Sequence, residues 1–304
     1  MEKNYKYNLD KSSRKFLCPM CNRKTFVRFK DAEGNYASDK YGRCDREVNC
    51  GHFLYPASEQ SWTPAPPKAK RPQIYIPESI LKRTLQGYSL NGFLNNLLKQ
   101  GISPEAVQRI TEDYYLGTIT KGIYTGAVCF PFIDEFHRIN AIQVKLFNEQ
   151  NKTTKTNWIH SILASSISEQ PNWLKDYYKN ESKVNCLFGI HLLHKYPNKK
   201  VIIAESPKNA ITGSLFLPEF LWLASGSLGY LNAEKFKALK GKDVMIIPDT
   251  STDSVAFDQW SFQAEKISKK VGLKISVTDF LESIVTEEQK SSGFDIADYF
   301  LQQK

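Results

Sequence analysis

The chain of 304 residues lacks any apolar run near the roughly 20 residues that a helix needs to cross a bilayer. Its first residues, MEKNYKYNLDKSSRK, are polar and hold no apolar segment of the kind that directs secretion. Internal repeats and long low-complexity tracts are also missing. We therefore expect a cytoplasmic protein with no membrane partner. With 41% apolar residues, the chain is long enough for two or three compact units.

Cysteine is scarce, with six in the chain, and four of the six cluster between residues 18 and 50. Such clustering is typical of metal binding in a reducing compartment and not of a disulfide framework. Cys129 and Cys186 stand in the apolar contexts AVCFPF and NCLFG, which favour buried, inert thiols.

The clustered cysteines have the spacing of a zinc site. Cys18 and Cys21 form a Cys-x2-Cys pair, and after a 22-residue gap Cys44 and Cys50 form a Cys-x5-Cys pair. Two such pairs close a tetrahedron around a structural Zn²⁺, with the intervening segments KTFVRFKD and NYASDKYGRC as β-segments of a ribbon. His52 is an alternative to Cys50 as the fourth ligand. Four unrelated buried cysteines would not explain the Pro, Gly and His around them.

Positive charge is concentrated at the same end of the chain. The net charge is +9, and residues 1–77 hold 15 Lys and Arg against 8 Asp and Glu, whereas residues 78–304 hold 26 against 24. This asymmetry favours contact with nucleic-acid phosphates over a merely solvated surface. The candidate contacts to single-stranded DNA or RNA are basic residues interleaved with aromatic ones: Arg23, Lys24, Arg28, Lys30, Arg43 and Arg46, with Phe26, Phe29, Tyr36 and Tyr41. The aromatic residues equally suit the small core of the ribbon, and Phe26 suits it best.

Proline density marks the clearest boundary. Six prolines between residues 56 and 77 predict a semi-rigid linker, because proline blocks helix interiors and favours extended chain. The sequence thus predicts an α+β multidomain fold in four parts: a zinc ribbon at 1–57, a linker at 58–77, a helical and β-hairpin middle region at 78–185, and an α/β domain at 186–304.

Within the middle region, apolar spacing predicts three short helices, near 80–85, near 93–98 and from Ser103-Pro104 onward. The β-rich runs AVCFPFID and INAIQVKLF predict a hairpin turning at 135–138. The polar stretch 148–185 predicts only a helix near 173–178.

In the last part, strands alternate with helices, and the strands are VIIAE, FLWLA, DVMIIPD and LKISVTDF. This alternation predicts a mostly parallel four-stranded sheet covered on both faces.

Acids end two of these strands, Glu205 in VIIAE and Asp249 in DVMIIPD. Ligands gather at the carboxyl ends of parallel strands, and carboxylates fixed there commonly hold Mg²⁺ or Mn²⁺. Asp253 would add charge to this metal site, and the glycine-rich SGSLG would bring backbone N–H groups near a phosphate. Such acids also cap helices. The pattern leaves both interpretations open for Glu205 and Asp249 and favours capping for Asp298.

This order of features resembles bacterial and phage primases, and the last part is similar to the Toprim domain that primases share with topoisomerases and related nucleases. VIIAESPKNAI resembles the first Toprim motif, with Glu205 at its acid, and IIPDTSTD resembles the second, beginning at Asp249. FDIADYF resembles the closing Asp-x-x-Asp element, with Asp295 and Asp298, and CLFGIHLL resembles the segment that introduces the domain. The whole chain, including GRCDREVNCGHFLYP, is more similar still to primase-like proteins encoded on mobile elements of gut bacteria.

The resemblance implies a primase-like protein that binds nucleic acid during DNA replication or transfer of a mobile element, with a replicative helicase or relaxase as partner. In such an enzyme Glu205 would act as general acid/base or metal ligand, Asp249 would hold Mg²⁺, and Lys208 would balance phosphate charge. The sequence departs from Toprim in two places, because Ser251 replaces the second acid of Asp-x-Asp and Ser206 replaces the usual glycine. A non-catalytic nucleic-acid-binding adaptor on a degenerate Toprim scaffold is therefore the alternative.

Overall fold

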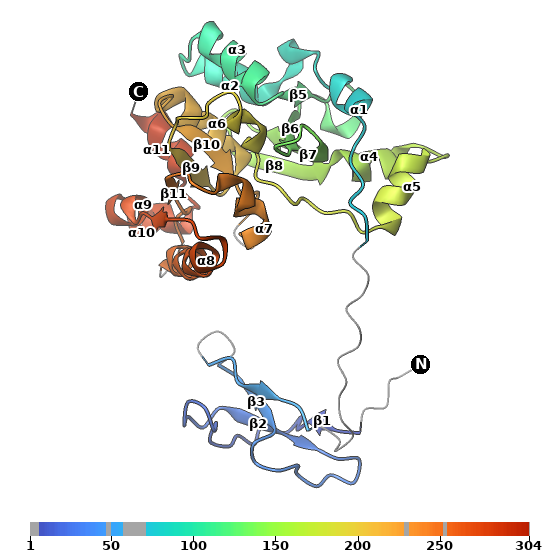
Figure 1. The fold of residues 1–304 in the computed structure, drawn as a ribbon, viewed down its shortest axis with the longest axis vertical. Coiled ribbons are helices and arrows are strands. Elements are labelled where there is room, and N and C mark those ends of the chain that lie inside the picture. Colours follow the sequence, from blue (N-terminus) through green and yellow to red (C-terminus); the bar gives the residue numbers. More distant parts are fainter. Residues whose placement is uncertain (1–5, 47–49, 57–70, 228–230, 252–253, 304) are drawn as a thin grey trace. The chain divides into compact units, whose positions relative to one another are not determined.

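The computed structural model describes residues 6–46, 50–56, 71–227, 231–251 and 254–303. The chain divides into two compact units, Met1–Lys70 and Arg71–Lys304, each described by itself below (Figure 1). Most of the predicted linker at 58–77 lies outside the described residues. In the described ranges no helix is long and apolar enough to cross a membrane.

The first unit is an antiparallel four-stranded sheet in the order β1-β2-β3-β4, formed by β1 (Asn8–Leu9), β2 (Phe26–Lys30), β3 (Gly42–Cys44) and β4 (Phe53–Leu54). Its interior is small, and the side chains of Cys18, Phe26 and Cys44 form the buried cluster at its centre. So few apolar groups cannot stabilise a module of this size by burial alone, which makes a metal ion or another cross-link necessary.

The second unit begins with short helices and an antiparallel sheet in the order β5-β6-β7-β8. Its elements are α1 (Glu78–Lys82), η1 (Tyr88–Leu90), α2 (Gly92–Lys99), α3 (Pro104–Asp113), β5 (Gly117–Thr118), η2 (Gly122–Tyr124), β6 (Val128–Ile133), β7 (Ile139–Phe147), β8 (Thr153–Trp158), α4 (Ile159–Ser166), α5 (Asn172–Lys179) and η3 (Ile190–Leu193). Ser103 caps α3 by accepting the N–H of Ala106, with Pro104 in the first turn, as the sequence predicts.

A parallel four-stranded sheet follows, in the order β10-β9-β11-β12. Its elements are β9 (Val201–Ala204), α6 (Pro207–Phe216), β10 (Leu221–Ala224), α7 (Ala233–Phe236), η5 (Lys237–Leu239), β11 (Val244–Ile246), α8 (Val255–Val271), β12 (Ile275–Val277), α9 (Phe280–Ile284), α10 (Glu287–Ser291) and α11 (Ile296–Gln302). The predicted α/β arrangement is confirmed, and all four strands are parallel.

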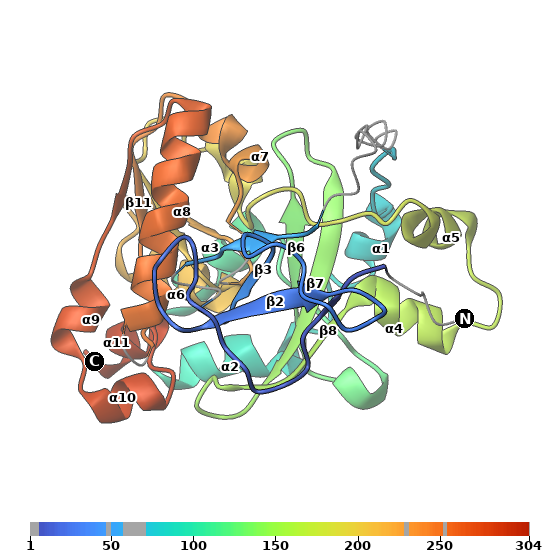
Figure 2. The same cartoon turned by 90° about the horizontal axis from the view of Figure 1, so that it is seen from below.

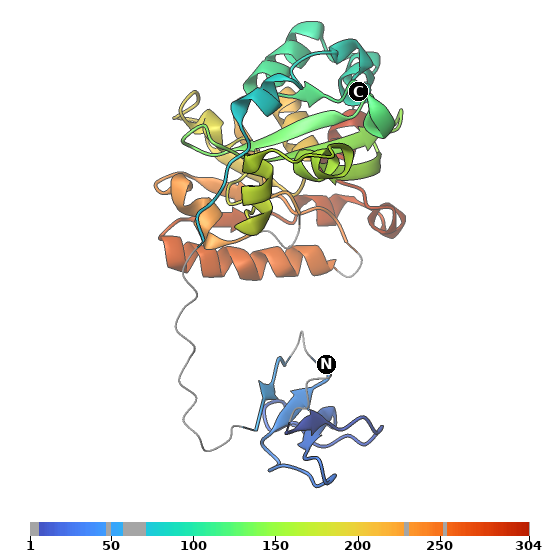
Figure 3. The ribbon, with the colours of Figure 1, turned by 90° about the vertical axis from the view of Figure 1, so that its right-hand side faces the viewer.

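Helices cover both faces of the parallel sheet. The chain steps from β9 to β10 in one direction and then back past β9 to β11, so right-handed crossovers put α6 on one face and α7 with α8 on the other. Helix α8 runs along the outer side of this sheet (Figures 2 and 3), and α11 packs on α6.

One hydrophobic core joins the two sheets of this unit. The ring of Phe188 stacks on Tyr114 at 5.2 Å between centroids and meets Phe132 of β6 edge-on at 5.7 Å. Tyr114 also donates its hydroxyl to the Trp222 carbonyl at 2.8 Å. The hairpin of β6 and β7 is therefore fixed against the parallel sheet, which matters for the site below.

Two segments of this unit differ from the sequence prediction. Residues 148–185 contain not only the predicted helix (α5) but also strand β8 and helix α4, which were not predicted. β8 reads TTKTNW with its first four residues exposed, so it shows no apolar alternation. The segment before α11 contains two five-residue helices, α9 and α10, that were also missed.

Gly213 of α6 gives a test of this packing. A Cβ at Gly213 would lie 2.4 Å from ring atoms of Trp222, which is fully buried and has no room to move. We expect Gly213→Ala to lower the free energy of unfolding by about 1–3 kcal/mol in denaturant titrations. Gly92→Ala in α2 is the control, because its Cβ would meet no atom closer than 3.7 Å. Equal stability of the two variants would contradict the packing described.

Candidate metal centres and nucleic-acid interface

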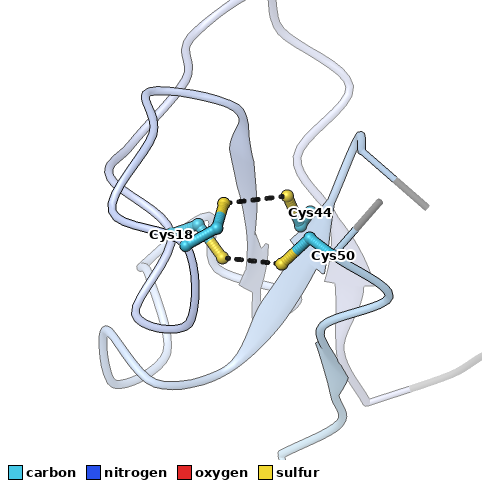
Figure 4. Close-up of side chains that lie close together, drawn as sticks. Cys18, Cys44 and Cys50 are labelled. Carbon is cyan, nitrogen blue, oxygen red and sulfur yellow. Dashed lines mark hydrogen bonds between the residues drawn. The ribbon is translucent and has the colours of Figure 1, made fainter. Parts of the chain in front are cut away.

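The four clustered cysteines converge in the first unit (Figure 4). The Sγ atoms of Cys18 and Cys50 lie 3.7 Å apart, those of Cys21 and Cys44 lie 3.9 Å apart, and all four fall within 4.8 Å of one another. Four sulfurs bound tetrahedrally at about 2.3 Å from one zinc ion would be about 3.8 Å apart. The cysteines therefore have the spacing of a structural zinc site with no open position for water.

His52 is not part of this cluster. Its ring lies 5.5 Å from the ring of Phe26, and its nitrogens do not join the group of ligand atoms around the four cysteines. The question left open by the sequence is therefore answered in favour of Cys50. The backbone N–H of Arg23 lowers the pKa of Cys21 to about 6, with the neighbouring thiols acting in the same direction, so a thiolate is available to a metal at neutral pH.

The burial of the ribbon's aromatic residues decides between the two interpretations that the sequence left open. Phe26 and Phe29 are buried, as was favoured for Phe26, so neither offers a stacking face, and Arg28 packs its guanidinium over Phe16 and Tyr36. Arg23 and Lys24 are exposed as predicted, whereas Lys30, Arg43 and Arg46 are partly buried.

Strand β4 supplies exposed rings that the sequence interpretation missed. Phe53 is 56% exposed and Tyr55 is 42% exposed, and Phe53 pairs in register with Arg43 of β3. The sequence did hold a signal for these exposed rings. The segments GRC and HFLYP contain the basic residue and the aromatic residues that the edge of this sheet brings together. These rings replace Phe26 and Phe29 as stacking candidates.

In the second unit, Glu205 and Asp249 follow neighbouring strands. Glu205 comes directly after β9 and Asp249 three residues after β11, and β9 and β11 pair in parallel with Ile203 opposite Ile246. Ser206 caps α6 by accepting the N–H of Asn209 at 3.2 Å. The capped first turn aims Asn209 at the site, where its Nδ2 donates to Asp249 Oδ1 at 2.7 Å.

Like charges crowd around Asp249. Burial raises the pKa of the Asp249 carboxyl well above its ordinary value, and the negative charges of Asp295 and Glu205 raise it further, against the opposing effect of Lys208. The three acids are thus electrostatically coupled. Their oxygens are not drawn as tightly together as the cysteine sulfurs, which form the only group of three or more metal-ligand atoms within 4.8 Å among the described residues.

Lys208 of α6 lies among these acids. Its Nζ is 2.6 Å from Asp295 Oδ2 and 3.9 Å from Asp298 Oδ1, and the side chains of all three residues are at least 87% buried. Asp295 and Asp298 also form the capping box of α11, so the predicted capping role of Asp298 is confirmed. Removing Lys208 would leave the buried Asp295 without its ion-pair partner, which is costly.

The β6–β8 sheet adds two lysines that the sequence interpretation missed. Lys152, in the turn between β7 and β8, lies 2.6 Å from Asp298 through its Nζ. Burial lowers the pKa of Lys145 of β7, the positive charge of Lys208 lowers it further, and the negative charges of Asp249, Asp295 and Glu205 oppose both effects. The Lys145 side chain therefore lies near enough to these acids for their charges to act on its pKa. Nothing in the sequence signals this, because both lysines come from a hairpin more than 50 residues before Glu205.

Ser251, which stands where the resemblance to Toprim motifs leads us to expect a second acid, has a structural role. Ser251 Oγ accepts the N–H of Ala256 at 2.8 Å at the start of α8, and its own N–H donates to Glu282 Oε1 at 3.2 Å. Asp253, the tentative third metal ligand, lies outside the described residues. Asp295 from α11 supplies the neighbouring negative charge instead.

The donor set at Asp249 fits a hard divalent cation. Carboxylate and amide oxygens are the ligands that Mg²⁺ and Mn²⁺ prefer. Asn209 Oδ1 is buried beside Asp249 without a hydrogen-bond partner in the described structure, which leaves an acceptor available to a metal-bound water.

Two family models match the chain. One, described as a domain of unknown function (DUF6371), matches residues 91–250, and the other, described as a putative zinc beta-ribbon finger, matches residues 5–64. The second confirms the predicted zinc ribbon. No curated protein matches the chain.

Several solved structures are similar to the chain at low identity. The DnaG catalytic core is 13% identical with a TM-score of 0.45, over 74% of this chain and 77% of that chain. The primase fragment of the bacteriophage T7 primase-helicase protein is 14% identical with a TM-score of 0.37, over 95% and 97%. The Aquifex aeolicus primase, with its zinc-binding and RNA polymerase domains, is 13% identical with a TM-score of 0.40, over 97% and 80%.

The ligand set of the zinc site is testable by substitution. We expect Cys50→Ala to lose zinc from the purified full chain, because three thiolates are left, and His52→Ala to retain it, because His52 is outside the cluster. Metal content per chain, measured by inductively coupled plasma mass spectrometry, checks both. Retention of zinc by Cys50→Ala together with its loss from His52→Ala would reverse the assignment.

Proposed function

The chain belongs to the family described as a domain of unknown function (DUF6371), and we propose that within it this protein binds single-stranded DNA or RNA and transfers nucleotides in a metal-dependent, primase-like reaction. Its setting is the replication or transfer of a mobile element, with a replicative helicase or relaxase as partner. The support lies in the Toprim-like motifs around Glu205 and Asp249, in the basic zinc ribbon and in the charges gathered at the acid site.

One observation carries the proposal: Asp249 has its pKa raised by burial and by the charges of Asp295 and Glu205, while Lys208, whose charge lowers it, is paired with Asp295 at 2.6 Å. A buried carboxylate crowded by two others is unfavourable by itself and becomes favourable when a divalent cation neutralises the group. A helix cap needs no such crowding. The arrangement therefore favours the functional interpretation of Glu205 and Asp249 over the capping one.

Each residue has a role in this reaction. A Mg²⁺ or Mn²⁺ ion held by Asp249 and Glu205 would supply Lewis-acid stabilisation of phosphate charge. Glu205 accepts the proton of the attacking 3′-hydroxyl, whose oxygen bonds to the α-phosphorus while the bond to pyrophosphate breaks. Lys208 and Lys145 lie where the phosphate charge accumulates and neutralise it.

In this proposal Asp295 supplies the negative charge that the second acid of the Toprim Asp-x-Asp motif would supply. Ser251 holds the start of α8 through its hydroxyl, which accepts the Ala256 N–H. The negative charges of Asp295 and Glu205 both raise the pKa of Asp249, so Asp295 belongs to the same group of interacting charges. The departure at Ser251 is thereby compensated from a different helix.

The second candidate is a non-catalytic nucleic-acid-binding adaptor on the same scaffold. The contact that favours it is the pair of Lys208 and Asp295 at 2.6 Å, because a lysine that already neutralises the acids replaces a metal ion. The two functions differ in one property: only the enzyme needs a divalent cation at Asp249.

We expect Glu205→Gln and Asp249→Asn each to reduce Mn²⁺-dependent primer synthesis on single-stranded DNA by on the order of 10²- to 10⁴-fold, because each removes a general base or a metal ligand. Chain-length analysis of labelled products measures the loss. Asp258→Asn is the matched control, since Asp258 is exposed on α8, and it should keep wild-type activity.

Mn²⁺ binding to the same proteins, followed by electron paramagnetic resonance, separates the two candidates. Wild-type protein that binds single-stranded DNA but neither binds Mn²⁺ nor makes product is an adaptor. Wild-type activity that survives in both acid variants rules out this site as the catalytic one.

A separate prediction concerns the ribbon. We expect Arg23→Gln combined with Lys24→Gln to weaken single-stranded DNA binding and to reduce the slope of log affinity against log salt by about 1.4, at about 0.7 per phosphate contact. Fluorescence anisotropy at several salt concentrations measures both quantities. Arg71→Gln is the control, because Arg71 is exposed and pairs with Glu181 in the second unit. An unchanged slope in the double variant would exclude these residues as phosphate contacts.

A further inference from the structure

A half-open cavity of about 150 Å³ lies beside the acid site, between the antiparallel sheet and the turn that follows β10. It is lined by two aromatic rings, a buried amide and a glycine turn: Phe132, Trp158, Gln143, Val184, Ser225, Gly226 and Ser227. At roughly 30 Å³ per water in the liquid, it holds about five waters, and it is smaller than the pockets of about 300 Å³ or more that enclose drug-sized ligands. Its volume suits one ring system.

Gln143 gives this cavity an unmet polar requirement. The side chain is 6% exposed, and its Oε1 is buried without a hydrogen-bond partner in the described structure. A buried amide oxygen left unpaired costs free energy that an apolar residue of similar size would not. A ligand that donates a hydrogen bond to Gln143 would remove that cost.

The aromatic lining selects a flat ligand. Phe132 is fully buried and Trp158 is partly buried, with ring centroids 5.9 Å apart and planes inclined at 49°. Trp158 is backed by His160, stacked at 6.0 Å, which fixes the indole in place. Proteins bind nucleobases by stacking the base on an aromatic ring and by forming hydrogen bonds to its edge. This cavity has an aromatic ring for the first contact and an amide for the second.

The cavity is joined to the acids through the backbone. The N–H of Gly226 donates to the carbonyl of Glu205 at 3.0 Å, and Ser225 Oγ donates to the same carbonyl at 3.3 Å. Gly226 has φ +100, a conformation that favours glycine, and a Cβ there would lie 3.3 Å from the Phe132 ring. Gly226 therefore allows the backbone of this turn to lie close to the Phe132 ring at the edge of the cavity.

Strand β7 spans the cavity and the acid site. Gln143 and Lys145 are two residues apart on β7, so their side chains lie on the same face, with Cα atoms about 7 Å apart at 3.4 Å per residue. Gln143 lines the cavity, and the charges of Glu205, Asp249 and Asp295 act on Lys145. That separation is about the length of a ribose between a base and its 5′-phosphates.

We infer that this cavity is the nucleobase pocket of the incoming nucleoside triphosphate, with Gln143 hydrogen-bonded to the base edge, Trp158 against its face and the phosphates directed along β7 toward Lys145 and the acids. This inference rests on the proposed function. It adds a binding site for the base of the nucleotide, whereas the acid site accounts only for the phosphates. Gln143 and Trp158 act in it as specificity residues, remote from the reacting atoms.

Titration calorimetry on the full chain in Mn²⁺ tests the pocket separately from the acid site. Inorganic tripolyphosphate engages only the metal and the lysines, whereas the four nucleoside triphosphates also carry a base. We expect at least one nucleoside triphosphate to bind on the order of tenfold more tightly than tripolyphosphate, as one stacked and hydrogen-bonded base provides. Gln143→Leu and Trp158→Leu should each abolish that gain and leave tripolyphosphate affinity unchanged.

Two controls make the outcome decisive. Gln150→Leu, on the exposed β7–β8 turn, should behave as wild type, and Gln143→Leu should be at least as stable as wild type, because it removes an unpaired buried oxygen. Equal affinity of wild type for tripolyphosphate and for all four nucleoside triphosphates would overturn the pocket, as would a full gain in Gln143→Leu. Failure of the proposed function has a different signature: tripolyphosphate binding that is absent, or that is unchanged by Glu205→Gln and Asp249→Asn.

Discussion

Partly buried acids that follow neighbouring strands cannot all be ionised unless positive charge lies among them. Here Glu205, Asp249 and Asp295 are near enough for two of them to raise the pKa of the third. Lys208 supplies one positive charge at 2.6 Å from Asp295, and the charges of the group act on Lys145, which comes from another sheet. The net charge of this group of acids and lysines therefore depends on which ligand is bound. A divalent cation, a phosphate or both would complete it.

This requirement explains why the second unit is built as one piece. The acids come from the parallel sheet and from α11, while Lys145 and Lys152 come from the antiparallel sheet, and Tyr114, Phe132 and Phe188 pack the two together. If the antiparallel sheet shifted, the acids would lose two of their positive neighbours. The zinc ribbon is independent of this arrangement, because its small interior depends on four cysteines and not on the second unit.

The parts of the molecule that were predictable from sequence are those with local signals. The Cys-x2-Cys spacing, the Ser103-Pro104 helix start and the buried strands ending at Glu205 and Asp249 all depend on residues close in the chain. Strand β8 was missed because its exposed TTKTNW has no apolar alternation, and the place of Phe29 was left open because periodicity alone does not say which face of the ribbon is inside. The roles of Lys145 and Gln143 depend on long-range packing, which no local pattern encodes.

The central claim is that the crowded acids at Asp249 hold a divalent cation. Anomalous diffraction from crystals of the full chain grown with Mn²⁺ tests it most directly. The account predicts a manganese peak at coordination distance, about 2.1–2.4 Å, from carboxylate oxygens of both Glu205 and Asp249, next to the orphaned Asn209 oxygen. A site without manganese, with Lys208 still paired to Asp295 and Asp249 protonated, would contradict it and leave a nucleic-acid-binding adaptor.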